Sequence, residues 1–389
     1  MQHMTSIKRH LPFSLAPLSI ALSLASPVMA GMTYEGDNGS LSFAGDVELD
    51  INAYNSQEAA RGSIFFAEEI ETRDEYNQTG RVLFEIAGER RSTEGHYARF
   101  KAQPLLGSDG GVGVDDAWLA IGNGQGGEVK VGRFEGYDLF PLQDVFIEHN
   151  GDTANNLYRD GSGYIYQVKE GRGRGASAGQ VLISQQVGDL YAELGTLFGD
   201  RSNLFDSDTY HGFSIDRDDT KNSAILRPVL AWTPGPWTLA AGAETNVVSD
   251  AVVDERGVDI SDRTGYGIRL SYAAGDLSVN LNLAYLDAHE ESNATVGVNA
   301  LWRRVGLGYI HADNEIGEVN PAADPEAVTP EGNYTADTIY TSYHFPDVLG
   351  IEDFHTYLGA FYSMIDHDAN GDLSDADRYG ARLRLKYHF

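Results

Sequence analysis

The side chains best suited to bind a metal ion lie near the end of the chain, in the segment 366–377. Carboxylate or amide oxygens occupy its first, third and fifth positions, glycine occupies the sixth, and a carboxylate returns at the twelfth. Hard oxygen donors at this spacing, with a glycine for the turn, are what Ca²⁺ coordination requires. The sequence therefore predicts a calcium loop with the candidate ligands Asp366, Asp368, Asn370, Asp372 and Asp377.

This segment also resembles a twelve-residue EF-hand loop, with two departures. The usual flanking helices are missing, and Asp377 stands where a longer glutamate is more common. The alternative is an acidic surface loop that holds no ion.

Aromatic side chains are frequent in the segment 135–173. Aromatic faces stack on sugar rings, which makes this segment a candidate for carbohydrate contact. The residues that we single out are Tyr137, Phe140, Phe146 and Tyr158. The alternative is that these rings only pack the segment against its surroundings.

Composition argues against several other functions. The chain has 58 acidic and 28 basic residues and a formal net charge of −30, so nucleic acid is an implausible partner. It has no cysteine, which excludes thiol chemistry and disulfides. We find no H-E-x-x-H pattern and no Ser or Asp nucleophile motif supported by histidine, so the sequence predicts no enzyme and no required cofactor.

The elements that must position these side chains are β-strands. Apolar and polar residues alternate with period two in 41–53 and again in 378–389. Alternation alone also suits a soluble sheet, but transmembrane strands of about nine to eleven residues recur along the whole chain. We place sixteen strands near 40–54, 80–90, 95–104, 114–121, 128–134, 174–187, 189–198, 222–233, 237–248, 263–274, 277–288, 294–302, 305–313, 336–345, 354–365 and 378–389.

These strands predict an all-β fold, an antiparallel transmembrane barrel of sixteen strands. Short connections such as Gly188 and Gly275-Asp276 belong on the periplasmic side, and long acidic loops alternate with them outside. Closing the sheet satisfies every backbone group and leaves an aqueous lumen. Closure also brings the acidic positions of the first strand beside the basic ones of the last: Asp46, Glu48 and Asp50 beside Arg382, Arg384 and Lys386.

The first thirty residues have the order of a secretory signal peptide. Basic residues precede an apolar stretch from Leu11 to Leu24, and Val28-Met29-Ala30 forms a small-x-small cleavage pattern. We therefore expect a signal peptide in 1–30 and a single barrel domain in 31–389.

The sequence resembles the sixteen-stranded trimeric general porins of Gram-negative outer membranes. The segment 129–134 (VKVGRF) resembles their fifth-strand glycine-arginine signature. The segment 144–153 (DVFIEHNGDT) resembles their third-loop motif, with Ile147 for a proline, His149 for a phenylalanine and Asn150 for the first glycine. The terminal Phe389 resembles the end that such barrels present to the barrel assembly machinery.

This resemblance implies that the third loop, 135–173, folds into the lumen and narrows the pore. Its carboxylates would be Asp144, Glu148 and Asp152, and they would face Arg81, Arg99, Lys101 and Arg174 on the opposite wall. Asp115 and Asp116 stand where the family usually has an arginine, which leaves no basis for an anion preference. Facing charges across a wet gap favour dipolar solutes over apolar ones.

The function that the resemblance implies is passive diffusion of small hydrophilic solutes and ions through an outer-membrane porin. It further implies a homotrimer surrounded by outer-membrane lipid and lipopolysaccharide. The first alternative is a carbohydrate-selective porin. The second is a calcium-binding or adhesive surface barrel, which would have a plugged lumen and no conductance.

Overall fold

The chain folds almost entirely into β-strands. The computed structural model describes residues 31–59, 70–142, 179–205, 207–323, 331–367 and 376–389. The strands in these ranges are β1 (Gly31–Gly36), β2 (Gly39–Ala59), β3 (Ile70–Arg91), β4 (Tyr97–Gly107), β5 (Val112–Gly122), β6 (Gly127–Arg133), β7 (Gly179–Val187), β8 (Leu190–Gly199), β9 (Thr209–Tyr210), β10 (Phe213–Ser214), β11 (Ser223–Trp232), β12 (Trp237–Asn246), β13 (Thr264–Ala274), β14 (Leu277–Ala288), β15 (Glu291–Trp302), β16 (Val305–Ile316), β17 (Gly332–Phe345), β18 (Phe354–His367) and β19 (Ala376–His388). The 3₁₀ helices η4 (Arg201–Asn203) and η5 (Val348–Gly350) lie in connections. None of the helices in the described ranges is long and apolar enough to cross a membrane.

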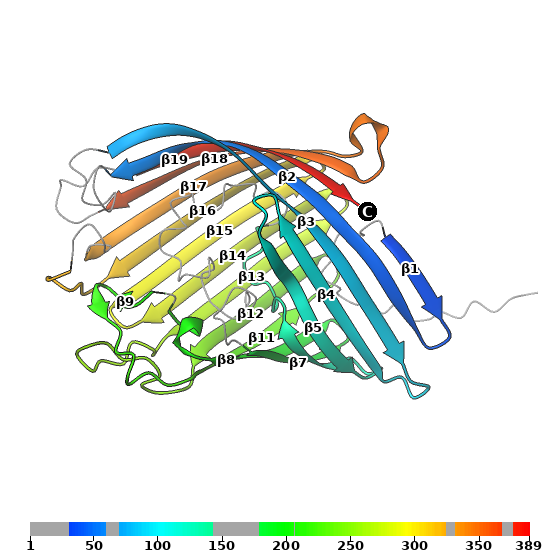
Figure 1. Ribbon diagram of the computed structural model, residues 1–389, viewed down its shortest axis with the longest axis horizontal. Helices are drawn as coiled ribbons and strands as arrows, with labels where there is room; N and C mark the ends of the chain where they lie inside the picture. The colour runs from blue at the N-terminus through cyan, green and yellow to red at the C-terminus, as the bar shows by residue number, and fades with distance from the viewer. Residues whose placement is uncertain (1–30, 60–69, 143–178, 206, 324–330, 368–375) are drawn as a thin grey trace, which may run out of the picture.

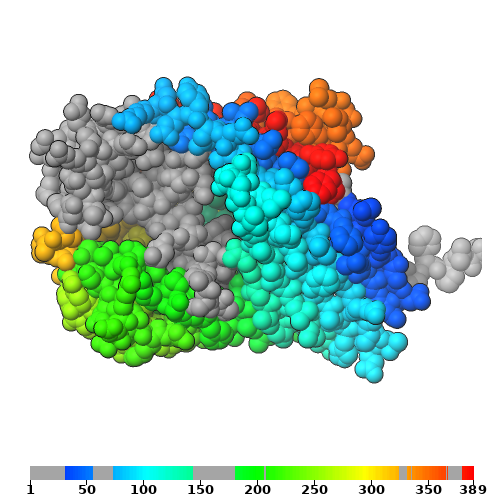
Figure 2. Space-filling view, viewed as in Figure 1, coloured from blue at the N-terminus to red at the C-terminus, as the bar shows by residue number. Residues whose placement is uncertain are grey.

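Seventeen of the described strands form one antiparallel sheet that closes on itself (Figure 1). Each wall strand pairs with the next, and β19 returns to pair with β2 from Gly380 opposite Tyr54 to His388 opposite Asp46. The strand β1 pairs only with the first part of β2 and continues the line of β19, so the other sixteen strands make the wall. This confirms the predicted sixteen-stranded barrel. The red C-terminal residues accordingly pack beside the blue N-terminal strands in Figure 2.

The two faces of the wall differ as the alternation predicts. In β16, for example, Val305 and Leu307 are exposed on the outside, whereas Ile310 and Asn314 are buried on the inside. Exposed aromatic side chains form a row near the short turns and a second row near the opposite end. The first includes Trp232, Trp237, Trp302, Tyr343, Phe345 and Tyr387, and the second includes Tyr266, Tyr285, Tyr362 and Tyr379. Two such rows are typical of the interfaces of a membrane barrel.

The structure corrects several predicted boundaries. The strand β1 was not expected, and β2 and β3 are longer than the predicted strands 40–54 and 80–90. The strand β7 is described from Gly179, and its predicted start at 174 lies outside the described residues. Two connections at the outer end, 108–111 and 289–290, are tight turns rather than long loops. The turn residues did not show which of these connections were short, because Gly and Asp suit tight turns at either end of the barrel.

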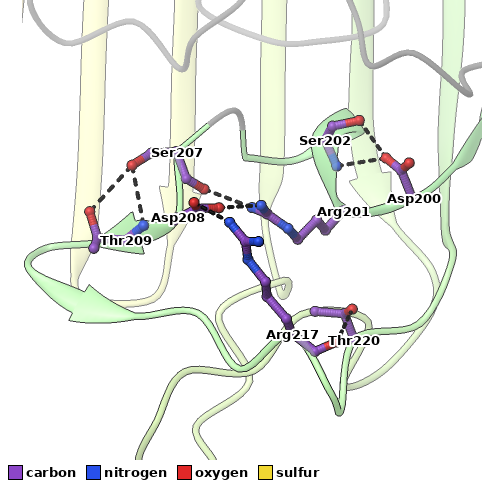
Figure 3. A network of polar contacts seen from close by, with 8 residues as sticks. All are labelled: Asp200, Arg201, Ser202, Ser207, Asp208, Thr209, Arg217 and Thr220. Carbon is purple, nitrogen blue, oxygen red and sulfur yellow. Dashed lines mark hydrogen bonds and ion pairs between the residues drawn. The ribbon is translucent and has the colours of Figure 1, made fainter.

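Several outer connections pack into a small structure of their own. Residues from 199–223 and 246–264 form an apolar cluster that includes Phe205, Tyr210 and Val252. Asp208 accepts hydrogen bonds from both Arg201 and Arg217, and the Arg201 guanidinium also donates to the carbonyl of Ser207 at 2.8 Å (Figure 3). The Arg217 and Arg201 guanidinium groups hold the pKa of the Asp208 carboxyl below its usual value. These contacts order the outer rim beside β8 and β11.

Candidate pore constriction

The chain turns into the barrel directly after β6, and the segment 134–142 lies along the inner wall opposite. Four side chains of that wall donate hydrogen bonds to backbone carbonyls of this segment. They are Arg227 Nη2 to Tyr137 (2.7 Å), Arg269 Nη1 to Asp138 (3.1 Å), and Asn282 Nδ2 and Asn299 Nδ2 to Pro141 (3.1 and 2.8 Å). Buried carbonyls need such donors, so the wall of β11 to β15 is built to hold this segment.

Two glycines of the wall make room for the apolar side chains of the segment. A Cβ added to Gly242 in β12 would lie 2.8 Å from Leu139 Cδ1, and one added to Gly297 in β15 would lie 2.6 Å from Phe140 Cζ. Both distances are too short for van der Waals contact. Glycine at these positions therefore permits the close approach of Leu139 and Phe140.

A buried ion pair anchors the start of the same segment. Arg227 is 1 % exposed, and its Nη1 lies 3.1 Å from Glu193 Oε1. The same Glu193 oxygen accepts a hydrogen bond from the backbone N–H of Tyr137 at 2.9 Å, and the other oxygen accepts one from the Tyr191 hydroxyl at 2.7 Å. A buried charge without such partners would cost several kcal/mol. Tyr137 is thus fixed to the wall through its backbone on both sides.

The wall facing this segment carries a network of lumenal charges, which we call the charge belt. It belongs to β19, β2, β3, β4, β5 and β6, and each of its basic side chains lies within 4.0 Å of a carboxylate. The pairs are Arg81 with Asp46 (3.8 Å) and Asp115 (4.0 Å), Arg99 with Glu128 (2.5 Å), Lys101 with Glu85 (3.2 Å) and Asp116 (3.7 Å), Lys130 with Glu128 (3.9 Å), Arg382 with Asp50 (3.3 Å), Arg384 with Glu48 (3.2 Å) and Asp50 (2.8 Å), and Lys386 with Glu48 (3.3 Å). The belt therefore presents charges of both signs to the lumen.

A β-bulge turns two neighbouring carboxylates toward the lumen together. Between the pairs Ala102 to Ala117 and Pro104 to Val114, the two residues Asp115 and Asp116 of β5 face one residue of β4. The bulge reverses the alternation, because Val114 on one side and Ala117 on the other both face outward. Two acids consequently enter the belt at one level of the wall.

Arg133 stabilises this bulge from the next strand. Its Nε donates to the carbonyls of Val114 (2.8 Å) and Asp115 (2.9 Å). This residue is the arginine of the glycine-arginine signature, and the side chain is exposed on the outer side of the wall. The contacts of Arg133 are structural, since its guanidinium donates to carbonyls that the irregular strand pairing leaves without a backbone donor.

Apart from Asp366 and Asp377, the structure places the predicted site residues in three groups. Arg81, Arg99 and Lys101 lie in the charge belt. Tyr137 is 6 % exposed and stacks on Tyr191 with a ring-centroid distance of 5.7 Å, and Phe140 is half-buried against the wall. Both rings thus contact the protein, as the packing alternative expects. Outside the described residues lie Asp144, Glu148, Asp152, Arg174, Phe146, Tyr158, Asp368, Asn370 and Asp372.

The two remaining calcium candidates lie at the ends of the β18–β19 hairpin. The strand pairing sets Met364 opposite Asp377, so the chain returns close to Asp366 after the loop. Both candidates therefore belong to paired β-strands, with Asp366 opposite Thr335 and Asp377 opposite Met364.

Other belt residues were not singled out from the sequence. Glu128 and Lys130 alternate with Val129 and Val131, so the period-two pattern was sufficient to find them. Glu85 was equally visible beside Phe84 and Ile86. The pair of Glu193 and Arg227 was not, because the sequence does not set the register between the neighbouring strands β8 and β11, in which Glu193 lies opposite Val229.

A closed barrel of sixteen strands with a polar lumen, an apolar outer face and an inward loop defines an outer-membrane porin. Consistent with this class, the chain belongs to the porin family whose model is described as porin-like glycoporin RafY, which matches residues 43–389. None of the curated proteins compared with the chain matches it.

Solved structures of porins share the fold at low sequence identity. The outer membrane channel DcaP of Acinetobacter baumannii aligns with a TM-score of 0.60 and 11 % identity, covering 92 % of this chain and 99 % of its own. Salmonella typhi OmpF, in a complex with daunomycin, gives 0.57 and 11 %, covering 92 % and 100 %. The anion-selective porin from Comamonas acidovorans gives 0.51 and 14 %, covering 90 % and 100 %. The protein is an outer-membrane channel for passive diffusion of small hydrophilic solutes.

Proposed function

We propose that this channel carries small uncharged polar solutes, sugars among them, and discriminates only weakly between ions. The observation that supports this is the pairing in the charge belt, where each basic side chain lies within 4.0 Å of a carboxylate. The field of closely paired opposite charges falls off steeply with distance. A solute then gains little from net charge, and the net charge of −30 gives cations a modest advantage.

The narrowest part of the pore in this proposal lies between the charge belt and the third loop. Asp144, Glu148 and Asp152 would face Arg81, Arg99, Lys101 and Arg174 across the water. Support comes from the described start of the loop, 134–142, which is already held inside the barrel. Aromatic residues farther along, Phe146 and Tyr158, would offer ring faces to sugars, and the family model named for a glycoporin agrees with such a solute.

Liposome swelling together with planar-bilayer recording tests this function. We expect swelling rates to fall with solute size from a monosaccharide to a trisaccharide, and to change little between a neutral sugar and a charged sugar acid of similar size. The reversal potential in a tenfold KCl gradient should lie close to zero, on the cation side. A reversal potential near the Nernst value of either ion, or the absence of sugar-driven swelling, would contradict the proposal.

We further propose that the chain is exported by the signal peptide in 1–30 and assembles as a homotrimer among outer-membrane lipid and lipopolysaccharide. The terminal Phe389 would be read by the barrel assembly machinery. Its backbone N–H donates to the Gly45 carbonyl at 3.0 Å, and its ring contacts Phe84 edge-on.

We also propose that the loop 366–377 binds Ca²⁺, a proposal supported by its pattern of candidate ligands alone. Transport itself involves no chemical step.

A further inference from the structure

A histidine and two glutamates bring their ligand atoms together at the outer rim of the barrel. His289 and Glu290 form the tight turn between β14 and β15, and Glu318 lies just after the end of β16. One ligand atom from each of the three lies within 4.8 Å of the other two. Glu291 pairs with Ile316 where β15 begins and β16 ends, so the strand register places the turn beside Glu318.

The ring of His289 has a nitrogen that is buried without a hydrogen-bond partner. In the part of the chain that the structure describes, its Nε2 is shielded from solvent and meets no donor or acceptor. Buried polar atoms are rarely left in this state. In the tautomer that is protonated at Nδ1, Nε2 has a free lone pair and is a metal ligand. This nitrogen points to a bound cation independently of the two carboxylates.

The backbone holds the Glu290 carboxylate against the chain that carries Glu318. Glu290 has a φ of 52°, a left-handed conformation that is uncommon for such a residue. Its carbonyl accepts a hydrogen bond from the Gly317 N–H at 2.9 Å. A Cβ added to Gly317 would overlap Glu290 Oε2, so the absence of a side chain there leaves the space that this carboxylate occupies.

Arg256, from the outer loop 246–264, orients the carboxylate of Glu318. Its Nη1 donates to Glu318 Oε2 at 2.7 Å, and its Nε donates to Asp254 Oδ2 at 2.7 Å. A carboxylate has two oxygens, so Glu318 can accept from the guanidinium with one and bind a cation with the other. The carboxylates of Asp254, Glu290 and Glu318 outnumber this one guanidinium, so the local charge favours a cation.

We propose that His289, Glu290 and Glu318 bind Zn²⁺ at the outer rim of the channel. Zn²⁺ takes imidazole nitrogen and carboxylate oxygen at about 2.0–2.2 Å, and three protein ligands with water as the fourth are a common zinc set. Such ligand atoms lie about 3.4 Å apart in tetrahedral geometry, so they must close from within 4.8 Å. Both glutamates are exposed, which leaves their side chains room to rotate toward the ion.

This site goes beyond solute transport and differs from the proposed calcium loop in its chemistry. Ca²⁺ takes oxygen ligands alone, as the loop 366–377 offers, whereas imidazole nitrogen beside carboxylate oxygen suits Zn²⁺.

Calorimetric titration of the untagged, refolded barrel in detergent with ZnCl₂ tests the site, with excess CaCl₂ present to occupy acidic loops. We expect His289→Ala and Glu318→Gln each to weaken the tightest Zn²⁺ site at least about tenfold, because each removes a ligand. Glu315→Gln is the matched control for the glutamate, since Glu315 is exposed on the same strand as the approach to Glu318. His96→Ala is the control for the histidine, since His96 is exposed in the β3–β4 turn at the opposite end.

Both control variants should bind Zn²⁺ with the affinity of the parent. Slow migration of unheated samples in electrophoresis shows that each variant is folded, and His289→Gln replaces His289→Ala if the alanine variant is not. A parent that binds no Zn²⁺ would overturn the proposal, as would His289→Ala or Glu318→Gln binding within twofold of the parent. Because binding is measured directly, failure here leaves the swelling and reversal-potential tests of the channel unaffected.

Discussion

Asp50 and Arg384 form a two-point contact that joins the first wall strand to the last. Arg384 Nε donates to Asp50 Oδ1 at 2.8 Å, and Arg384 Nη2 donates to Asp50 Oδ2 at 2.8 Å. A bidentate pair fixes orientation as well as distance, so it selects one register between β2 and β19. Neighbouring contacts of Glu48 and Asn52 with the same strand repeat that register.

We expect Asp50→Asn to destabilise the closed barrel by about 1–3 kcal/mol, because it leaves Arg382 and Arg384 without their shared carboxylate. Urea unfolding in lipid vesicles measures this. Asp276→Asn is the control, since it breaks an exposed pair at 3.1 Å between Asp276 in the β13–β14 turn and Arg303 in the β15–β16 turn, worth about 0.2–1 kcal/mol. Equal losses of stability in the two variants would show that the pair of Asp50 and Arg384 stabilises the barrel no more than an exposed pair does.

Gly297→Ala should disturb the inward segment of the third loop, because the new methyl group would lie 2.6 Å from Phe140 Cζ. We expect a loss of about 1–3 kcal/mol and an altered single-channel conductance. In a Phe140→Ala background the same substitution should cost much less. A double-mutant cycle with no coupling between the two positions would contradict direct packing of Phe140 on this wall.

Replacing both bulge carboxylates, Asp115→Asn with Asp116→Asn, should move ion selectivity toward anions. Arg81 and Lys101 each lose one acidic partner. One charge at 4 Å in water is worth about 1 kcal/mol, so the anion-to-cation permeability ratio should rise by up to about fivefold. Reversal potentials in a KCl gradient measure this, with Asp276→Asn as the control. An unchanged potential would mean that the belt does not border the ion path.

Acid should loosen the outer loop 246–264 only at low pH. Burial alone would raise the pKa of Asp254, but hydrogen bonds from the Arg256 side chain and the backbone N–H groups of Val258 and Arg256 outweigh it and lower the pKa. A lowered pKa in the folded state contributes stability above the unfolded value of about 3.9, and this is lost as the pH falls through the folded value.

Limited digestion with pepsin between pH 2 and 5 follows this transition. We expect cleavage in 246–264 to begin below about pH 4 in the parent. Asp254→Asn should be cleaved there at every pH tested, because the charged acceptor is absent. If the variant resists pepsin at pH 5 as well as the parent does, the Asp254 carboxylate does not stabilise this loop.

Much of the wall was predictable because one physical rule, alternation toward lipid and water, sets every spanning strand. The rule also predicted the seam, since Asp46, Glu48 and Asp50 share a face with one another and meet the basic face of β19. The bulge at Asp115 and Asp116 was not predictable in this way, because there the alternation itself breaks.

The support of the third loop could not be found from the sequence for a different reason. Arg227, Arg269 and Asn299 look like any other lumenal polar residues along their strands. Their role comes from carbonyl groups ninety or more residues away in the chain, which only the folded path of 134–142 brings to them. Gly242 and Gly297 are similar, since a strand glycine alone does not reveal what approaches it.

The position of β1 brings the two ends of the described barrel together. Gly31 pairs with Ala44, and Phe389 exchanges hydrogen bonds with Gly45, so the two ends of the folded domain meet on adjacent residues of β2. A short peptide joining Phe389 to Gly31 would turn the wall into a nearly covalent ring. A circular permutant opened in the turn 108–111 should then fold to the same barrel, which heat-modifiable electrophoresis would reveal.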